Sequence, residues 1–383
     1  MRNALAPVLL LATCTQAADL LVAPGGGGNM YPTISAAIAA AAPNDRILIA
    51  PQVFNEDVTI NKALELVSNS STGRYTVNRT VNLAATAPDA RITISGLSAI
   101  GDLTETAPMG VGAMVTMVGC RLSRVEMLMG QGRMALYRDS IFGEVVILRG
   151  DVIGCYVSGT PDSGGILITG GSMSTETNRV IGNDIGAAMT NTSFWPIMIQ
   201  PCAPFICENN LLRINMTNSS SFPLFVPNAP TPSTMPCTIR NNTFRYPDHP
   251  NAYFIKIEQS APSFTLDIRN NLFVGPVPID PIDVVPGSST TEAYNVLSFD
   301  LGSIDPVSGV PTSGSPAINA GDPDAQYTDL DLTRNDAGCH GGSSSRDNFD
   351  DPLPTTAVIC FVNAPRRTQT ALSIPISAEG TDR

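Results

Sequence analysis

Asp267-Ile-Arg-Asn-Asn-Leu-Phe273 repeats, with small changes, a pattern that occurs three times earlier in the chain. The earlier copies are Val180-Ile-Gly-Asn-Asp-Ile185, Phe205-Ile-Cys-Glu-Asn-Asn-Leu211 and Thr238-Ile-Arg-Asn-Asn-Thr-Phe244. Measured on one asparagine in each copy, the steps are 26, 32 and 29 residues, between Asn183, Asn209, Asn241 and Asn270. This period is too long for a hairpin and suits one turn of a solenoid, whose turns bury their apolar residues against each other. We expect these asparagines to stack at a left-handed corner, each side chain bonded to the next.

Length and composition narrow the possible functions. One solenoid can take up all 383 residues without a domain break, and 43% hydrophobic residues can build its core. Lys and Arg total 22 against 34 Asp and Glu, a net charge of −12. This balance disfavours nucleic acid and anionic membrane surfaces as partners, because both attract basic faces. No apolar stretch is long enough for a transmembrane segment.

The first residues have the pattern of an export signal. Arg2 supplies the positive start, residues 4–12 are apolar, and Thr15-Gln-Ala17 provides small residues for cleavage. We therefore expect residues 1–18 to be a signal peptide and the protein to be secreted or held at the cell surface. Two alternatives remain open, which are a lipoprotein anchored through Cys14 and a buried N-terminal strand.

Eight cysteines are present, and removal of the signal would leave seven. Cys120 and Cys155 stand where later turns have the corner asparagine, which predicts stacked, buried thiols. Cys202 and Cys207 are close enough in sequence to close a small disulfide loop in an oxidising compartment. With two histidines and no paired C-x-x-C spacing, the sequence disfavours a zinc site.

The N-terminal part of the chain holds the most persuasive helix pattern. Residues 33–42 are strong helix formers with apolar residues at 34, 37, 38 and 41, and Pro43 ends the run. The flanking alternating segments predict short strands, at residues 20–23, 46–50, 58–60 and 64–67.

Taken together, the stretch from Thr33 to Lys62 resembles the opening of secreted pectin-lyase-like right-handed β-helices. In that superfamily the amphipathic helix covers the open end of the first coil, where it prevents edge-to-edge pairing. The resemblance implies an all-β fold, a right-handed parallel β-helix (solenoid) with an N-terminal capping helix, which we place at residues 19–310. Between Asp45 and Gly275 we expect on the order of nine coils.

A C-terminal closing segment is expected at residues 311–383. Gly314-Ser-Pro-Ala-Ile-Asn-Ala-Gly-Asp-Pro323, followed by Asp329-Leu-Asp-Leu-Thr-Arg-Asn-Asp-Ala-Gly338, resembles the closing segment of bacterial secreted β-helix proteins. Two strand candidates follow at residues 357–362 and 372–378. They are expected to cap the solenoid or to begin an appended module.

The stretch from Gly132 to Cys155 is similar to the coil pattern of pectinesterases, which share this fold. Its glycines and strands keep the family's register, but Val146 stands at the position of the nucleophilic Asp. Val125 likewise replaces the Gln that stabilises the oxyanion. Loss of both groups should abolish ester hydrolysis. Three polar side chains remain candidates to line a groove, with a solvated surface ladder as the alternative: Glu126, Arg133 and Asp139.

Other chemistries known on this fold lack their motifs here. The chain has no Arg-x-Pro-x-x-Arg segment of a lyase, and the carboxylate and G-H-G segments of a polygalacturonase-like hydrolase do not occur in order. We therefore favour a non-catalytic extracellular protein that binds neutral polysaccharide or serves as a surface structure or adhesin. The alternative is a carbohydrate-active enzyme, namely a lyase, glycoside hydrolase or pectinesterase-like protein with an unrecognised site.

An acidic cluster lies in the closing segment. Its carboxylates fall within fifteen residues and are Asp322, Asp324, Asp329, Asp331 and Asp336. Oxygen ligands in irregular loops suit calcium, which we predict as the cofactor of this cluster. The alternative is a set of turns in which each carboxylate accepts bonds from nearby backbone amides.

Overall fold

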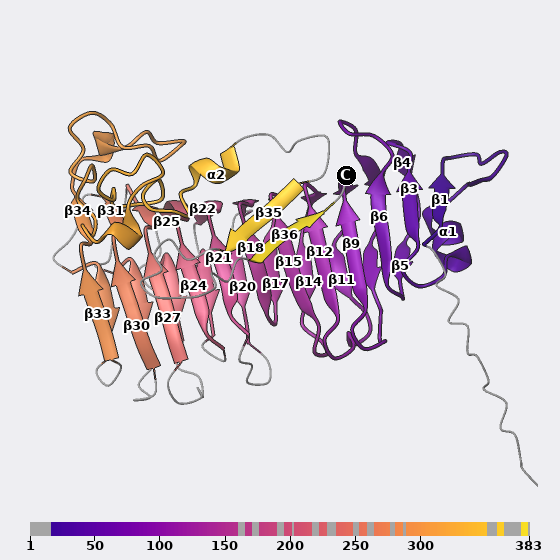
Figure 1. Ribbon diagram of the computed structural model, residues 1–383, viewed down its shortest axis with the longest axis horizontal. Helices are drawn as coiled ribbons and strands as arrows, with labels where there is room; N and C mark the ends of the chain where they lie inside the picture. The colour runs from indigo at the N-terminus through magenta and orange to yellow at the C-terminus, as the bar shows by residue number, and fades with distance from the viewer. Residues whose placement is uncertain are drawn as a thin grey trace, which may run out of the picture.

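The computed structural model describes residues 17–159, 165–170, 176–189, 195–200, 203–216, 222–227, 235–247, 253–258, 264–275, 280–285, 289–350, 358–363 and 377–381. The proposed export signal and Cys14 lie outside these residues, apart from the signal's last two positions. Three long sheets, each built only of parallel pairs, wind along one axis (Figure 1). The predicted fold is confirmed. The chain is a right-handed parallel β-helix.

Each turn contributes one strand to each sheet. Sheet A contains β2 (Met30–Tyr31), β1 (Asp19–Val22), β3 (Arg46–Ile49), β6 (Leu64–Ser68), β9 (Arg91–Ser95), β12 (Met114–Val118), β15 (Arg133–Tyr137), β18 (Gly150–Ile153), β21 (Asn178–Ile181), β24 (Phe205–Glu208), β27 (Met235–Arg240), β30 (Phe264–Arg269) and β33 (Ser289–Ala293). Sheet B contains β4 (Val53–Phe54), β7 (Tyr75–Val77), β10 (Leu97–Ala99), β13 (Arg121–Leu122), β16 (Ser140–Ile141), β19 (Tyr156–Ser158), β22 (Asp184–Met189), β25 (Leu211–Met216), β28 (Thr243–Arg245), β31 (Leu272–Val274) and β34 (Val296–Ser298). Sheet C contains β5 (Val58–Ile60), β8 (Val81–Leu83), β11 (Leu103–Glu105), β14 (Val125–Met127), β17 (Glu144–Ile147), β20 (Gly165–Ile168), β23 (Ile197–Ile199), β26 (Leu224–Val226), β29 (Ile255–Ile257) and β32 (Ile282–Val284).

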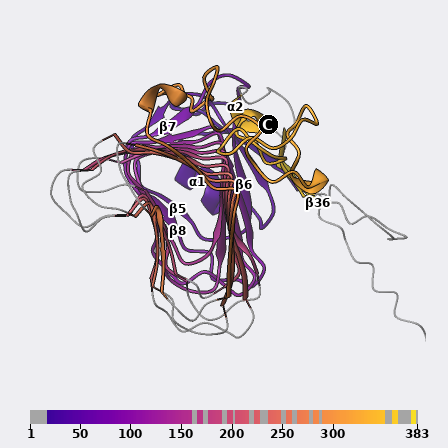
Figure 2. The same cartoon turned by 90° about the vertical axis from the view of Figure 1, so that its left-hand side faces the viewer.

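The core lies inside the tube formed by the three sheets, which Figure 2 shows end-on. Because side chains alternate along a strand, each short strand sends one or two apolar residues inward, as in Val58, Ile60, Val81 and Leu83. These residues belong to a single buried cluster that runs from the first coil to the last. Nine of the ten described strands of sheet C lie between Asp45 and Gly275, which agrees with the nine coils expected there, and β32 completes a tenth coil.

The predicted helix is confirmed as α1 (Ile34–Ala40), which lies across the N-terminal end of the tube (Figure 1). Thr33 caps it, since its hydroxyl accepts a 3.1 Å bond from the amide of Ala36. The helix buries Ile34, Ala37 and Ile38 against the first coil. Its position covers the core end that neighbouring chains would otherwise reach.

The corner between sheets A and B uses two residues with opposite orientations. The first has left-handed backbone geometry, as in Asn209, Asn241 and Asn270, whose φ angles are 55°, 50° and 59°. The second points into the tube, and its amide nitrogen donates to the next coil's amide oxygen at 2.8–3.0 Å, along Asn183, Asn210, Asn242, Asn271 and Asn295. The left-handed corner is therefore confirmed at Asn209, Asn241 and Asn270, of which Asn270 bonds Asn241 at 3.4 Å, whereas the continuous ladder runs through Asn183 and the residue after each of the other three.

The inward ladder continues toward the N-terminus through Cys155, Asp139 and Cys120. Cys155 and Cys120 donate their backbone amides to Asn183 Oδ1 and Asp139 Oδ1 at 2.8 and 2.6 Å. Both thiols are buried and free, as predicted, and burial raises their pKa so that they stay protonated. Cys207 is also a free buried thiol, and its predicted partner Cys202 lies outside the described residues.

After β34 the chain turns back along the outside of the tube. From here on, the closing segment means residues 299–350, the part of the chain that follows β34 and is described without a gap. It includes η1 (Leu301–Ser303), η2 (Ala325–Tyr327) and α2 (Asp347–Asp350), and Figure 1 shows it in orange and yellow over the last coils. The outward corner asparagines hold it. Asn241 Nδ2 donates to Asn335 Oδ1 and to the carbonyl of Asp336 at 3.0 and 3.1 Å, and Asn209 Nδ2 donates to the Gly341 carbonyl at 2.6 Å.

At its end, the closing segment also covers part of sheet A. Phe349 packs against an apolar group on the outer face of that sheet that includes Ile153 and Ile181. Gly154 and Gly182 are required there, since a Cβ on either would lie 2.5 or 2.2 Å from the Phe349 ring. Glycine, rather than asparagine, therefore occupies the corners under this ring.

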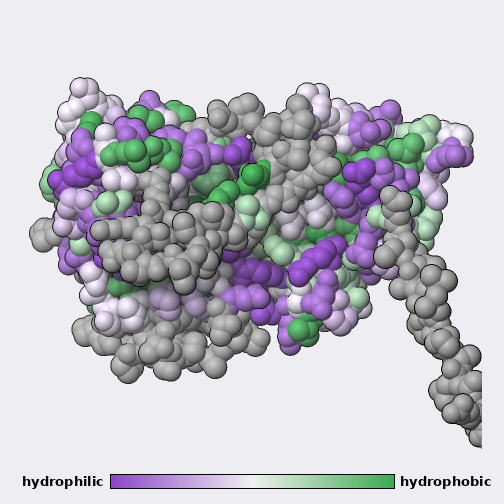
Figure 3. Space-filling model, in the orientation of Figure 1, coloured by the Kyte–Doolittle hydropathy of each residue, from purple (hydrophilic) through white to green (hydrophobic). Residues whose placement is uncertain are grey.

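The last described residues form a small antiparallel hairpin of β35 (Val358–Asn363) and β36 (Ser377–Thr381). The first matches the strand predicted at 357–362, and the second overlaps the end of the one predicted at 372–378. On the face drawn in Figure 3, hydrophobic and hydrophilic residues mix in small groups among the coloured atoms. Within the described chain, no helix has the length and apolarity needed to cross a bilayer.

Candidate functional site

The five aspartates proposed as metal ligands fall into two groups. Asp322 and Asp324 lie against the outer face of sheet A, where they belong to a network of ion pairs and turns. Asp329, Asp331 and Asp336 line a hollow of about 490 Å³ within the closing segment. The structure thus brings three of the predicted ligands together and places two elsewhere.

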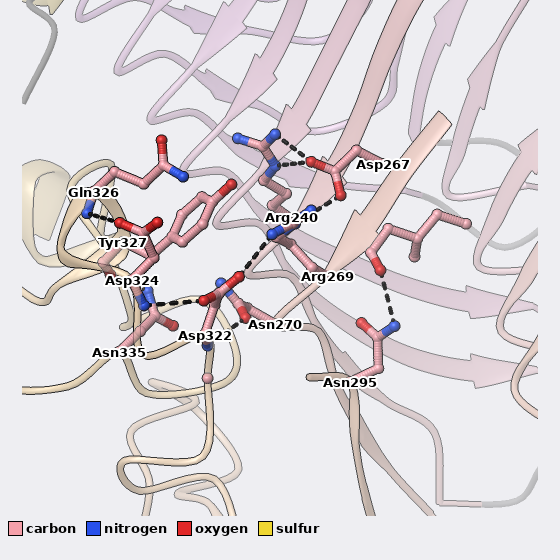
Figure 4. Close-up of polar contacts among 12 residues, drawn as sticks. Arg240, Asp267, Arg269, Asn270, Asn295, Asp322, Asp324, Gln326, Tyr327 and Asn335 are labelled. Carbon is pink, nitrogen blue, oxygen red and sulfur yellow. Dashed lines mark hydrogen bonds and ion pairs between the residues drawn. The ribbon is translucent and has the colours of Figure 1, made fainter. Parts of the chain in front are cut away.

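Asp322 is committed to an ion pair that fastens the closing segment to sheet A (Figure 4). Its Oδ2 accepts a 2.6 Å bond from Arg269, which also donates to Asp267 Oδ1 at 2.7 Å. Arg240, one coil earlier, bonds the other oxygen of Asp267. The ring of Tyr327 lies over both guanidinium groups, 5.4 Å from Arg240 and 5.1 Å from Arg269. These contacts, which we call the latch, attach the closing segment to sheet A and do not form an open binding site.

Asp324 shapes the turn that presents Tyr327 to the latch. Its amide donates to Asp322 Oδ1 at 3.0 Å, and its own Oδ1 accepts a 3.1 Å bond from Gln326 at the start of η2. These are local carboxylate-to-amide bonds of the kind expected in turns. For this pair the turn alternative describes the geometry.

In the hollow, the three other carboxylates also accept bonds from backbone amides. Asp329 Oδ1 accepts from Gly342 at 2.7 Å, and Asp336 Oδ1 accepts from Asn319 at 2.6 Å. Asp331 Oδ1 accepts from both the amide and the hydroxyl of Thr333. The rest of the wall combines aliphatic side chains, among them Ile318 and Leu330, with polar ones that include a fourth carboxylate, Asp347.

The three carboxyl groups differ in how readily they ionise. Burial raises the pKa of Asp329 to about 6. The neighbouring Asp336 carboxylate raises it further, whereas the bonds that Asp329 accepts from backbone amides lower it. Burial also raises the pKa of Asp336. The pKa of Asp331 is lowered by its bonds from Thr333. A divalent cation would relieve the repulsion between the first two.

His340 closes one side of the hollow and is held at both ring nitrogens. Nδ1 lies 2.8 Å from Asp347 Oδ1, and Nε2 lies 2.9 Å from the carbonyl of Ser308. Burial by itself lowers the pKa of His340, but the electrostatic influence of the neighbouring Cys339 and the contacts with Ser308 and Asp347 raise it to about 10. Since both nitrogens face acceptors, the ring is a structural imidazolium with no free base.

Among the described residues, no three His, Cys, Asp or Glu side chains are arranged to hold one metal ion. The oxygen donors of Asp329, Asp331 and Asp336 are nevertheless the ligand type that calcium takes. Calcium at this hollow stays a prediction.

The side chains proposed to line a groove in the pectinesterase-like stretch are engaged in internal contacts. Arg133 pairs with the buried Asp151 at 2.6 Å, and burial raises the pKa of that carboxyl. Glu126 pairs with Arg124 on the face of sheet C. Asp139 does not reach the surface, because it is a rung of the corner ladder and is 1% exposed. Glu126 and Arg133 are both half-buried, and their ion pairs fit the surface-ladder alternative, whereas Asp139 lies inside the tube.

Val146 and Val125, the two residues aligned with the nucleophile and the oxyanion donor of pectinesterases, are both buried. Val146 is on the outer face of sheet C beside Glu126 but is only 5% exposed. Val125 points into the core and is fully buried. Neither position offers a nucleophile or a hydrogen-bond donor.

Two features escaped the sequence reasoning. Arg240 and Arg269 occupy the same place in two copies of the repeat and lie side by side in the sheet. Two adjacent positive charges require carboxylates between or beside them, and this pattern could have predicted the ion pairs. A group of exposed rings, Phe142 and Tyr156 beside Arg121, lies on sheet B and has no sequence motif. Its side chains come from three successive coils, so only the coil register brings them together.

No protein-family model matches this chain, and no curated protein matches it. Among solved structures, the chain is similar to the crystal structure of pectate lyase Pel9A, with 15% sequence identity and a TM-score of 0.37. The alignment covers 86% of this chain and 97% of that one.

Proposed function

We propose that this protein is an exported, non-catalytic β-helix that binds neutral polysaccharide. The observation that carries the proposal is the engagement of the polar side chains in the pectinesterase-like stretch. Arg133 is tied to a buried carboxylate, Asp139 is inside the corner ladder, and an apolar residue stands at the nucleophile position. The long, straight tube offers instead a repetitive surface along which an extended chain can lie.

The test is a paired screen for retention and for turnover. The mature protein is run through native gels containing neutral xylan, galactomannan or mixed-linkage glucan, and the same glycans and methylated pectin are assayed for reducing ends, unsaturated products and methanol. We expect retardation in at least one neutral gel and no product above a boiled control. Product release would support the enzyme alternative, and absence of retardation in every gel would contradict polysaccharide binding.

We also propose that calcium binds the hollow of Asp329, Asp331 and Asp336 and draws these carboxylates together. Binding only to the folded state should raise the melting temperature as calcium increases through the millimolar range. Magnesium should substitute poorly, because it demands tighter octahedral geometry than irregular loops supply. The Asp331→Asn variant should lose the response, whereas Asp324→Asn should keep it. A melting temperature unmoved by calcium and by chelator would remove the metal.

A further inference from the structure

The outer face of sheet B is divided into a covered and an open part. From β25 onward the closing segment lies on it, so that Leu272 packs with Ile304 and Ala337, and the amide of Cys339 bonds the hydroxyl of Thr243. Arg346 of the closing segment reaches Asp184 of β22 at 3.3 Å and marks the border. Toward the N-terminus from this border, Arg121 in β13, Phe142 directly after β16 and Tyr156 in β19 form a separate group of side chains.

The open part carries two aromatic rings that are 39% exposed, Phe142 and Tyr156. Their centroids are 6.4 Å apart with planes at 63°, so each ring keeps part of its surface toward solvent. The guanidinium of Arg121 lies 4.6 Å from the Phe142 centroid. Single exposed apolar side chains are ordinary on a protein surface, but these come from three adjacent coils and meet at one place.

We propose that this aromatic shelf, defined as Arg121, Phe142 and Tyr156, is the surface on which the protein binds a neutral polysaccharide. The proposal rests on the function proposed above and assigns its site. A pyranose ring has an apolar face of C–H groups that packs on an aromatic ring, and hydroxyls at its rim that need hydrogen-bond partners. The two rings of the shelf can pack against the apolar face of the sugar, and Arg121 can donate hydrogen bonds to its hydroxyls.

Small residues beside the rings leave room for an extended chain. Ser140 pairs in register with both Arg121 and Tyr156, and Ser158 pairs with Gly186 of the next coil. These positions are partly exposed and supply hydroxyl groups without a bulky side chain. A polysaccharide lying along the axis would therefore cross the rings and meet polar groups at their sides.

The overall charge of the protein favours a neutral ligand. Asp184 is the carboxylate at the border, and Arg213 bonds one of its oxygens at 2.7 Å while Arg346 bonds the other. Arg121 makes no ion pair within the described residues, and it can donate to hydroxyl and ring oxygens. At long range the net charge of −12 repels a polyanion. Beside the shelf Arg121, Arg213 and Arg346 outnumber Asp184, so the preference for an uncharged glycan rests on this long-range repulsion of polyanions.

The experiment measures retardation of purified variants in native gels that contain the neutral glycan retained by the wild type, with polygalacturonate gels as the anionic comparison. The Phe142→Ala and Tyr156→Ala double variant should bind at least roughly tenfold more weakly, as expected from loss of two stacking surfaces. Tyr156→Phe keeps the ring and should bind as the wild type does. Phe299→Ala, which removes an exposed ring of the closing segment, is the matched control and should not change binding.

The outcomes separate the site from the function. If the wild type is retarded and the double variant is retarded equally, the shelf is not the site, although polysaccharide binding stands. An equal loss in Phe299→Ala would also overturn the shelf, because binding would then follow exposed apolar surface in general. If no neutral glycan retards the wild type, the function and the shelf both fall. Equal melting temperatures among the variants would establish that any loss is local.

Discussion

Replacing Asp139 by asparagine is expected to stabilise the protein, and to do so more strongly as the pH rises. Each ladder asparagine donates Nδ2 to a backbone carbonyl of the preceding coil, as Asn183 does to Val152 at 2.8 Å. In Asp139 the corresponding atom, Oδ2, is buried and has no hydrogen-bond partner. An amide at this position would supply the missing donor and would remove a carboxyl group from the core.

The pH dependence follows from the ionisation of this carboxyl. Burial raises the pKa of Asp139 to about 8, against the amide bond from Cys120 that lowers it. The folded state therefore holds the proton more tightly than the unfolded chain, whose Asp pKa is about 3.9. The contribution of the protonated Asp139 carboxyl to the free energy of unfolding is fully present below pH about 3.9 and is lost as the pH rises toward 8. Between these limits the advantage of the variant should grow by up to about 1.4 kcal/mol per pH unit.

Urea unfolding of wild type and variant at several pH values between 4 and 9 measures this difference. Groups common to both proteins cancel in the comparison. Asp151→Asn is the control, because that buried carboxyl is paired with Arg133, and its loss should destabilise the protein at neutral pH. A difference between Asp139→Asn and wild type that does not change with pH would contradict the buried, protonated carboxyl.

The second large effect is expected at the adjacent residues Asn241 and Asn242. Asn242→Ala should destabilise the protein by about 3 kcal/mol, because the buried backbone and side-chain amides of Asn210 lose their acceptor and the Cys207 carbonyl loses its side-chain donor. Asn241→Gly keeps the left-handed corner, and it removes the bonds to the closing segment together with the long 3.4 Å bond that Asn241 Oδ1 accepts from Asn270 Nδ2. Its cost should be about 1–2 kcal/mol.

Two readouts distinguish these variants. The midpoint of urea unfolding should fall further for Asn242→Ala than for Asn241→Gly. Limited proteolysis should cut the closing segment faster in Asn241→Gly, with the coils still protected, because only its attachment is weakened. Equal destabilisation without earlier cleavage of the closing segment would show that the outward asparagine does not hold it.

The parts of this structure that depend on local periodicity were predictable. The helix at Ile34–Ala40 follows from apolar residues spaced three and four apart, and the strands near Arg46, Val58 and Leu64 follow from alternation. The corner ladder was predictable in kind but not in register. In an Asn-Asn pair only the backbone angle decides which side chain points inward, and the clue was Gly182 before Asn183.

The candidate sites were less predictable because they depend on distant contacts. Asp322 reaches Arg269 across 53 residues, and Asn241 reaches Asn335 across 94. Neither contact has a local pattern, so the acidic segment looked like five equivalent ligands. The position of Asp139 was misjudged for a related reason, since its corner follows Arg138, a left-handed residue that is neither glycine nor asparagine.

The closing segment changes the order in which this molecule can be built and dismantled. A bare solenoid makes contacts only between adjacent turns, so it can fray from its last turn one coil at a time. Here the closing segment bonds to the corners from Asn209 to Asn270, and its Arg346 also reaches Asp184. It is synthesised after all the coils, when the capped first coils have emerged and had time to fold. Binding of the closing segment then joins the last coils to one another, and we expect these coils to unfold together rather than one at a time.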